Sequence, residues 1–213
     1  MTCVSSSWVP RRSRTLAEFI VRARAAPTQA DNFRVAIGRG QGVEFLADII
    51  RHTLFVAQGH RDDAVLHLVL EKSQDFSRVI TLTGAELGSV GDLHEGALLE
   101  LIARALAEGE GLGKDEAVTT GEGLIVQATS FEHLVRDKAS GLPTFVLSPK
   151  GSDIRETPLT ASDVYVMTDH TPMPKNTFKS MARQGVKPLS LGPQMLHAAQ
   201  CITLIHNEHD RRC

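Results

Sequence analysis

The sequence has few of the features that mark secreted or membrane proteins. Only three of its 213 residues are cysteines, at positions 3, 201 and 213, and two of these stand near the chain ends, where a disulfide would constrain little of the core. No framework spacing is present, which favours a reducing compartment. No apolar run reaches the ~18 residues of a membrane span. The Ser- and Arg-rich first 16 residues lack the apolar centre of a secretory signal. We expect a cytoplasmic protein.

Neither sign of charge predominates. The 23 Lys and Arg residues face 25 Asp and Glu residues, which gives a net charge of −2 and a sequence pI of about 6.5. Proteins that bind RNA through bulk charge are usually basic, so RNA binding here would need a local basic patch. The hydrophobic content of 42% is ordinary for a globular domain. We expect residues 1–16 to be a disordered extension and residues 17–213 to form one domain.

Several catalytic signatures are absent. There is no G-x-S-x-G, so acyl transfer has no support, and no G-x-G-x-x-G follows the first strand, which disfavours a dinucleotide-binding domain. The segment GRGQG at 38–42 lacks the Lys-Ser/Thr ending of a phosphate loop and is more typical of a flexible loop, with Arg39 open as an RNA phosphate contact. His206 and His209 share a helix face, but no spacing supplies the ligands of a zinc site, and we expect no metal.

Hydrophobic periodicity alternates between strands and helices. The apolar run AVLHLVL at 64–70 is typical of a parallel strand covered on both faces, and EGALLELIARALA at 95–107 is a strong helix. This alternation predicts an α/β fold with a mostly parallel sheet and right-handed connections. The expected strands cover residues 17–25, 64–70, 78–83, 123–128, 144–147, 163–167 and 188–191, the expected helices cover 43–58, 95–107, 130–138, 174–184 and most of the chain after Pro193, and loops are expected at 26–41 and 109–120.

The most informative stretch is PLSLGPQMLHAAQCITLIHNEHDRR at 188–212. Its short strand runs into Gly192, which permits a positive φ or the close approach of a ligand. Pro193 follows, and it suits the first position of a helix. A strand, a tight turn and a helix start together form a place where backbone amides can hold a small molecule. The stretch therefore predicts a ligand site at this turn.

This stretch resembles the end of the SPOUT-class tRNA pseudouridine N1-methyltransferases, the archaeal enzymes and their bacterial relatives. In that family SLGP-x-x-L, a cysteine and HNE-x-DR close a knotted methyl-donor site. The likeness extends from Glu18 to Arg212 and includes FIVRARAAPT and HEGALLELIARAL. It implies an α/β fold with a mostly parallel sheet and a C-terminal trefoil knot. The matching residues of the final segment are Ser190, Leu191, Gly192, Pro193, Leu196, Cys201, His206, Asn207, Glu208, Asp210 and Arg211.

The resemblance also implies S-adenosyl-L-methionine as the cofactor and RNA, in particular tRNA, as the partner. In VMTDH, Met167 and Thr168 stand where the family commonly has Leu and Gly, whereas Asp169 and His170 match. Backbone groups would bind the cofactor, and apolar side chains would surround its adenine. The implied cofactor-binding residues are Leu147, Thr168, Leu191, Gly192, Pro193, Gln194, Met195, Leu196 and Cys201.

The last helix carries a second implication of the resemblance, a homodimer built around it. Cys201, Leu204, Ile205 and Glu208 recur at i, i+3, i+4 and i+7 and give the helix one mostly apolar face. In a single domain the same face could simply pack on the sheet. The pattern alone leaves both arrangements open.

A polar segment with Arg61 and Asp63 precedes the strand at 64–70, and it aligns with an Arg-x-Asp segment of the family. Taken alone, such a segment is typical of a turn that caps a strand. By resemblance, Asp63 is the catalytic candidate that accepts a proton from the target base or orients it. Arg22, Arg24 and Arg61 are the candidates for RNA phosphate contacts. Two other functions stay open: methylation of another RNA position, such as a ribose 2′-hydroxyl, and RNA binding without catalysis.

Overall fold

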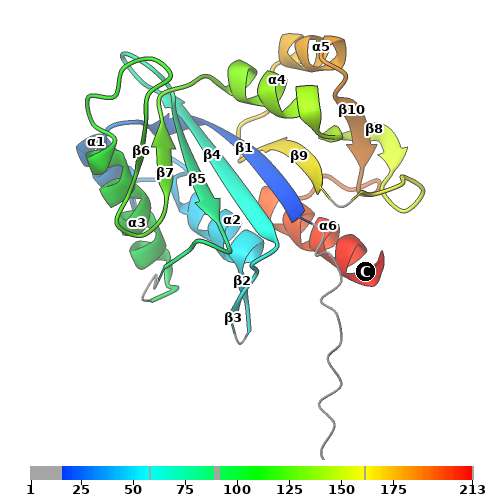
Figure 1. Cartoon of the computed structure of the whole chain (residues 1–213), viewed down its shortest axis with the longest axis horizontal. Helices are drawn as coiled ribbons and strands as arrows, with labels where there is room; N and C mark the ends of the chain where they lie inside the picture. Colours follow the sequence, from blue (N-terminus) through cyan, green and yellow to red (C-terminus); the bar gives the residue numbers. More distant parts are fainter. Residues whose placement is uncertain (1–15, 58, 89–91, 161, 213) are drawn as a thin grey trace, which may run out of the picture.

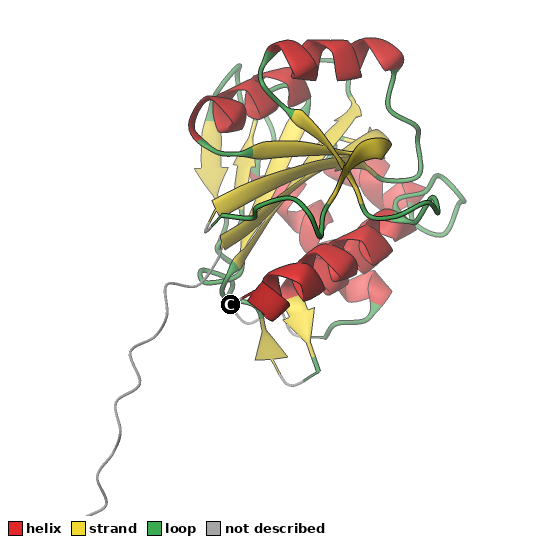
Figure 2. Cartoon of the chain, turned by 90° about the vertical axis from the view of Figure 1, so that its right-hand side faces the viewer, coloured by secondary structure: helices red, strands yellow, loops and turns green. Residues whose placement is uncertain are grey.

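The computed structural model describes residues 16–57, 59–88, 92–160 and 162–212. Residues 1–15, which make up nearly all of the predicted extension, lie outside this part. Helices flank a central twisted sheet on both faces (Figure 1 and Figure 2). The strands are β1 (Leu16–Pro27), β2 (Phe55–Val56), β3 (Gly59–His60), β4 (Ala64–Lys72), β5 (Arg78–Thr83), β6 (Ala117–Thr119), β7 (Ile125–Gln127), β8 (Thr144–Asp153), β9 (Ser162–Thr168) and β10 (Lys187–Ser190).

Eight of these strands form one sheet in the order β10-β8-β9-β1-β4-β5-β7-β6, and β2 and β3 form a separate hairpin. The five strands from β10 to β4 are parallel, whereas β5, β7 and β6 continue the sheet in antiparallel pairing. We call the end of the sheet where the parallel strands finish its carboxyl edge and the opposite end its amino edge. The predicted α/β class and mostly parallel sheet are confirmed.

The helices are α1 (Ala30–Ala36), α2 (Glu44–Leu54), α3 (Glu95–Glu108), α4 (Phe131–Gly141), α5 (Lys175–Arg183) and α6 (Ala198–Arg212). Helices α1, α2, α3 and α6 share one hydrophobic cluster on one face of the sheet, and α4 and α5 contribute to a second cluster on the other face. Phe19 and Val21 of β1 belong to the first cluster and Ile20 to the second. The sheet is thus covered on both faces, which explains its continuously apolar strands.

Most predicted elements are confirmed, but two elements were missed and three boundaries were wrong, the first being the end of β8, which runs to Asp153 where the prediction ended at 147. Helix α1 lies inside the predicted loop 26–41. Among the helix residues only Phe33 and Ala36 are buried, so the helical periodicity is too short to stand out. Strand β6 lies inside the predicted loop 109–120. Helix α2 ends at Leu54, whose carbonyl accepts the amide of Arg61 at 2.7 Å. The β2–β3 hairpin occupies the end of the predicted helix.

The third wrong boundary is the start of the last helix, because α6 begins at Ala198 and Pro193 lies in the preceding loop. The side chain of Gln200 accepts the backbone amide of His197 at 3.0 Å. Cys201 donates its amide to the His197 carbonyl, also at 3.0 Å. These bonds resemble one half of a capping box, in which the third helical residue satisfies the cap amide. The capping side chain, rather than the proline, sets the start of α6.

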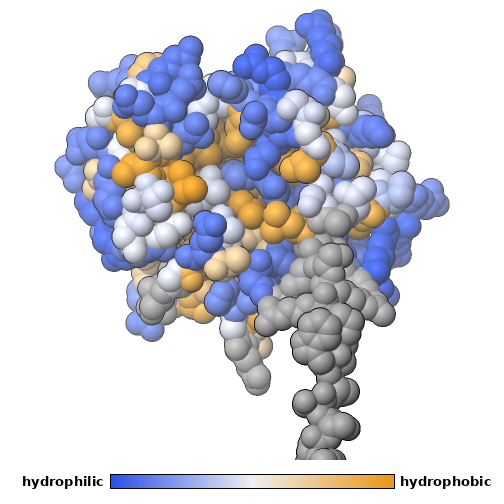
Figure 3. Space-filling view, in the orientation of Figure 1, coloured by the Kyte–Doolittle hydropathy of each residue, from blue (hydrophilic) through white to orange (hydrophobic). Residues whose placement is uncertain are grey.

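Helices α2 and α6 both run from the carboxyl edge to the amino edge. Phe45 near the start of α2 stacks on His170, which follows β9, with ring centroids 5.0 Å apart. At the other end, Arg61 pairs with Asp210 near the end of α6. The face in Figure 3 is mostly hydrophilic, with hydrophobic residues in small patches. Among the described residues, none of the helices has the length and apolarity that would let it cross a membrane.

Candidate active site

A cavity of about 530 Å³ opens at the carboxyl edge. Because β8, β9 and β10 are parallel, the segments that follow them meet at this edge, which is where ligands bind in open α/β sheets. Three chain segments and the first turn of α6 line it. Of the nine predicted cofactor-binding residues, the structure brings together all but Pro193: Leu147, Thr168, Leu191, Gly192, Gln194, Met195, Leu196 and Cys201.

The first wall of the cavity is an irregular part of β8. Pro188 of β10 pairs with Val146 of β8, but the next residue, Leu189, pairs with Ser152. The intervening residues 147–151 therefore leave the regular ladder, and three of them, 147–149, line the cavity. Gly151 lies against the backbone of Leu189, and a side chain there would overlap it. This irregularity opens the sheet at its edge and makes room for a ligand.

The second wall is the loop between β10 and α6. Gly192 has a φ of +122°, so the positive φ expected from the sequence is confirmed. Its amide donates to the Ser190 hydroxyl at 3.2 Å, which holds the turn but also uses an amide that the sequence suggested for the ligand. Met195 is 82% exposed at the rim. The turn is therefore shaped by a local side-chain bond, and residues 194–197 of the loop line the cavity.

The lining fits a ligand with a flat apolar group and a polar chain. Leu147, Leu191 and Leu196 provide apolar surface, while Thr168 and Gln194 add polar side chains. A volume of 300 to 1,000 Å³ with few polar groups is usual for cofactor sites. Burial raises the pKa of the Cys201 thiol to about 11. The thiol is therefore neutral at pH 7 and forms part of the wall rather than a nucleophile.

Two ionisable residues of the cavity, Asp169 and His170, come directly after β9. The side chain of Asp169 is only 2% exposed, and its Oδ2 lies 3.3 Å from Nδ1 of His170. Its Oδ1 accepts the amide of Thr171 at 2.9 Å. Burial raises the pKa of the Asp169 carboxyl. In the sequence, both residues stand out only as family matches; their position after a buried strand that ends at the carboxyl edge was the available signal.

The predicted RNA contact Arg22 is buried at the carboxyl end of β1. Its Nε lies 3.0 Å from both carboxylate oxygens of Glu71, and its two terminal nitrogens donate to Thr177 and Glu132, each at 3.1 Å. The guanidinium also lies 4.3 Å from the ring centroid of Phe131. A group with these contacts joins β1 to α4 and α5 and is not presented to a phosphate.

Arg24, the second predicted RNA contact, differs from Arg22 in exposure. Its side chain is 41% exposed and lies 4.0 Å from Glu71. A long, exposed cation at this distance is loosely held and free to reorient. Arg24 therefore stays accessible near the carboxyl edge.

Arg61 and Asp63 lie at the amino edge. Ala64 is level with Asp163 across β1, and Thr168 is five residues farther along β9, which is about 17 Å at ~3.3 Å per residue. Within one chain, the structure thus does not bring the catalytic candidate Asp63 to the cofactor cavity. Arg61 donates to both carboxylate oxygens of Asp210 and lies 3.5 Å from Asp63.

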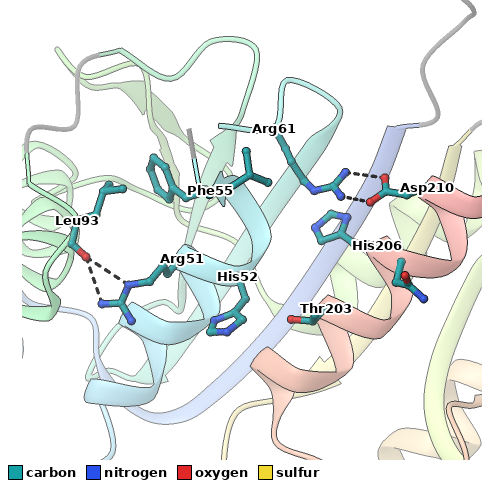
Figure 4. Close-up of a pocket in the computed structure, with 11 residues that line it drawn as sticks. Arg51, His52, Phe55, Arg61, Leu93, Thr203, His206 and Asp210 are labelled. Atoms are coloured by element: carbon teal, nitrogen blue, oxygen red, sulfur yellow. Dashed lines mark hydrogen bonds and ion pairs between the residues drawn. The ribbon is translucent and has the colours of Figure 1, made fainter. Parts of the chain in front are cut away.

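A second cavity, of about 590 Å³, lies beside this ion pair, between α2 and α6 (Figure 4). Most of its polar side chains already have partners within the chain; among the described residues, exposed Asn207 is the exception. Arg51 donates to the Leu93 carbonyl at 3.3 and 3.2 Å, and Nε2 of His206 donates to the Thr53 carbonyl at 3.0 Å. Burial lowers the pKa of His206 to about 4 and keeps the ring neutral.

The histidines near the end of α6 point to different partners. His206 faces Thr53, whereas Nε2 of His209 lies 2.7 Å from the Tyr165 hydroxyl. Asp210 faces Arg61. The matched segment HNEHDR therefore mainly fastens α6 to its own chain. The predicted apolar face is also divided, because Ile205 is fully buried in the core while Leu204 is 38% exposed.

Comparison with known proteins agrees with this geometry. A family model described as "Putative SAM-dependent RNA methyltransferase" matches residues 16–213. A "Putative pseudouridine methyltransferase" of Shewanella frigidimarina is 44% identical over 194 residues, which cover 91% of this chain and 98% of that protein. A protein of the same description from Photobacterium profundum is 45% identical over 192 residues, covering 90% and 97%.

Among solved structures, Archaeoglobus fulgidus Nep1 bound to S-adenosylhomocysteine has the same fold. Its TM-score is 0.58 at 11% sequence identity, with 92% of this chain and 97% of that chain covered. The sheet, its carboxyl-edge cavity and these similarities define an α/β methyltransferase. The chain belongs to the family of SAM-dependent RNA methyltransferases, and its cofactor is S-adenosyl-L-methionine. The resemblance found in the sequence is confirmed.

Proposed function

We propose that the protein methylates N1 of a pseudouridine in tRNA and binds its cofactor in the carboxyl-edge cavity. The observation that carries the proposal is the convergence of eight predicted cofactor residues, from three separate segments, on one cavity. The description of the relatives as pseudouridine methyltransferases supports pseudouridine as the target. Pseudouridine presents an N1–H that ordinary uridine lacks, so a site that removes this proton would distinguish the two nucleosides.

Bound S-adenosyl-L-methionine supplies a methyl carbon whose bond to sulfur breaks with both electrons going to sulfur. The chain would hold it with Leu147, Leu191 and Leu196 around the adenine and with backbone groups of the loop before α6. Thr168 and Gln194 are the polar side chains of the wall. Holding both reactants in line contributes several kcal/mol, at most about 7–11 for ideal alignment. The remaining task of the chain is to remove the N1 proton.

We further propose a homodimer and a trefoil knot at the C-terminus. Strand β9 lies between β8 and β1, β10 returns to the far side of β8, and α6 then crosses to β1 and α2; this path is compatible with a knot. In one chain Asp63 lies across the sheet from the cavity, so it would orient the target base from a second subunit. Arg24 and Arg61 remain the proposed phosphate contacts, and Arg22 does not.

The test of the function is nucleoside mass spectrometry of tRNA treated with the enzyme and a methyl donor carrying a heavy methyl group. We expect the label in N1-methylpseudouridine, and none in a matched transcript with uridine at every pseudouridine position. Label on a ribose 2′-hydroxyl would replace the proposal by the alternative methyltransferase. RNA binding without any label would replace it by the binding module. Light scattering should give about twice 23.2 kDa; a monomer would remove the role of Asp63.

A further inference from the structure

The imidazole of His170 is held in place by contacts with three residues. The first is Asp169, whose buried Oδ2 lies 3.3 Å from Nδ1 of His170, while about a third of the imidazole side chain, 33%, stays exposed in the cavity wall. A carboxylate next to Nδ1 favours the tautomer with the proton on Nδ1. Nε2 is then the unprotonated nitrogen. The ring is thus prepared to accept a proton at one defined atom.

The other two contacts come from Gly42, just before α2, and from Phe45, near the start of α2. Gly42 has a φ of +79°, and any side chain there would overlap the imidazole ring of His170. Phe45, three residues later, stacks on the same ring at 5.0 Å with an interplanar angle of 28°. The GRGQG segment, which its sequence suggested to be a flexible loop, therefore ends as a wall against His170. Its last glycine is required because the ring takes the place of a side chain.

We propose that His170 is the general base of methyl transfer and that Asp169 is its positioning residue. The inference rests on the proposed function, because the proton in question is that of N1–H. In the step, the N1–H bond breaks and the proton passes to Nε2 of His170. The electron pair left on N1 forms the new bond to the methyl carbon as that carbon leaves sulfur. Asp169 then stabilises the charged imidazolium through the close approach of its carboxylate, 3.3 Å from Nδ1.

The position of the pair favours His170 over the other candidates. Asp63 lies at the amino edge of the same chain, at least about 17 Å along the sheet from His170 at ~3.3 Å per residue. His197 also lines the cavity and stacks on Phe45, at 6.1 Å, but His170 is the cavity histidine with a carboxylate contact among the described residues. Asp169 is 2% exposed, so it can reach a substrate only through the more exposed imidazole.

The kinetic test compares His170→Gln and Asp169→Asn with the wild type in single turnovers, with tRNA and saturating methyl donor. We expect His170→Gln to lower the rate about 10²–10⁴-fold, the usual range for a lost general base, while the dissociation constant of the methyl donor, from calorimetry, changes less than about threefold. Added imidazole should restore part of the rate of His170→Ala. The matched control is a second Asp–His pair outside the cavity, Asp115 and His133, with Nδ1 and Oδ1 3.6 Å apart; His133→Gln should leave the rate unchanged.

Asp169→Asn should lower the rate on the order of 10²-fold by misplacing the imidazole proton. A readout independent of activity is the ¹⁵N spectrum of the histidine side chains in the cofactor-free protein. We expect the Nδ1–H tautomer for His170 in the wild type and a loss of that preference in Asp169→Asn. Circular dichroism verifies that both variants fold. If Asp169→Asn instead mainly weakens methyl-donor binding, Asp169 is a cofactor ligand and the inference is overturned.

Failure of the inference differs from failure of the proposed function. If the wild type methylates N1 and His170→Gln retains a rate within threefold of it, the function stands and His170 is not the base. If the wild type labels no pseudouridine, the proposed function fails, but the tautomer measurement still tests whether Asp169 places the proton of His170 on Nδ1. An Nε2–H tautomer in the wild type overturns that arrangement and with it the inference.

Discussion

The two cavities at opposite edges of the sheet are similar in size but differ in how their polar groups are used. At the amino edge, Arg61 is bonded to Asp210, Arg51 to the Leu93 carbonyl and His206 to the Thr53 carbonyl. At the carboxyl edge, the wall consists of loops that leave the regular ladder, and within the described part of the chain the imidazole of His170 has a polar contact at Nδ1 alone. A volume of about 590 Å³ therefore does not mark a functional site more strongly than one of about 530 Å³.

The comparison teaches that pairing within the chain separates structural from functional polar groups. A side chain whose donors are already satisfied loses those bonds when it turns to a ligand. A side chain that is positioned by one contact and open at another atom can act without that loss. By this criterion the amino-edge cavity is mainly a joint between α2 and α6, and the carboxyl-edge cavity is the site. Three variants test the criterion.

The largest expected effect concerns Arg22, a fully paired group that lies at the functional edge. Arg22→Met leaves Glu71, whose side chain is 16% exposed, without its main partner beside the core. We expect a loss of about 3–5 kcal/mol in the free energy of unfolding, because breaking a buried ion pair from one side strands the other charge. Urea unfolding measures it. The control Arg24→Met, at an exposed cation 4.0 Å from Glu71, should cost less than about 1 kcal/mol.

The double variant Arg22→Met, Glu71→Met removes both charges and should recover much of the lost stability. If Arg22 is instead an RNA ligand, as the sequence suggested, the measurements differ. In that case Arg22→Met would leave the urea midpoint unchanged. The salt dependence of tRNA binding would then become weaker by about one phosphate contact.

The fold could be read from the sequence where burial gives a clear period. The apolar runs of β1 and β4 and the amphipathic α3 were placed within two residues of their observed bounds. Helix α1 and strand β6 were missed because each has few buried residues, and the start of α6 was misplaced because a single Gln200 side chain sets it. Local capping is a short-range effect that periodicity does not report.

The cofactor site was predictable because sequence motifs at strand ends converge wherever strands are parallel. Leu147, Thr168 and Leu191 lie on separate segments, yet they line one cavity. The partners of the charged residues were not predictable in this way. Whether Arg22 meets Glu71 or a phosphate depends on packing between β1, β4 and α4, and that is a property of the tertiary structure.

The second prediction tests the amino edge through pH. Folded His206 stays neutral down to about pH 4, whereas unfolded His206 takes up a proton below about 6.5. The contribution of neutral His206 to the free energy of unfolding is therefore complete above about pH 6.5. It is lost as the pH falls from about 6.5 towards 4, by about 3 kcal/mol at ~1.4 kcal/mol per pH unit. His67 and His209 also have lowered pKa values, so the comparison must be with a variant.

His206→Gln keeps a donor for the Thr53 carbonyl and removes the titration. Between pH 7 and pH 4, urea unfolding should show that the wild type loses about 3 kcal/mol more stability than His206→Gln. The control is His52→Gln, at an exposed histidine of the same cavity, which should follow the wild type. Parallel pH curves for wild type and His206→Gln would mean that the ring is hydrated, and the amino-edge cavity would then be open to a ligand.

The smallest expected effect tests the loop at the carboxyl edge. Gly192 has a φ of +122°, and no protein atom lies within 4 Å of where a side chain would begin. Gly192→Val therefore acts through the backbone: a β-branched residue at such a φ costs about 1–3 kcal/mol, and the loop relaxes by changing shape. We expect the dissociation constant of S-adenosylmethionine to rise about 5- to 150-fold, the equivalent of that energy, in calorimetry.

Gly185 provides the matched control. It also has a positive φ, +84°, with open space around it, but it lies in the turn after α5 and outside the cavity. Gly185→Val should lower the melting temperature by an amount similar to Gly192→Val, because the same backbone strain arises, and leave methyl-donor affinity within about twofold. If both variants weaken binding equally, the loss reflects general destabilisation. The open loop then has no special part in binding, and the contrast between the two edges would rest on His170 alone.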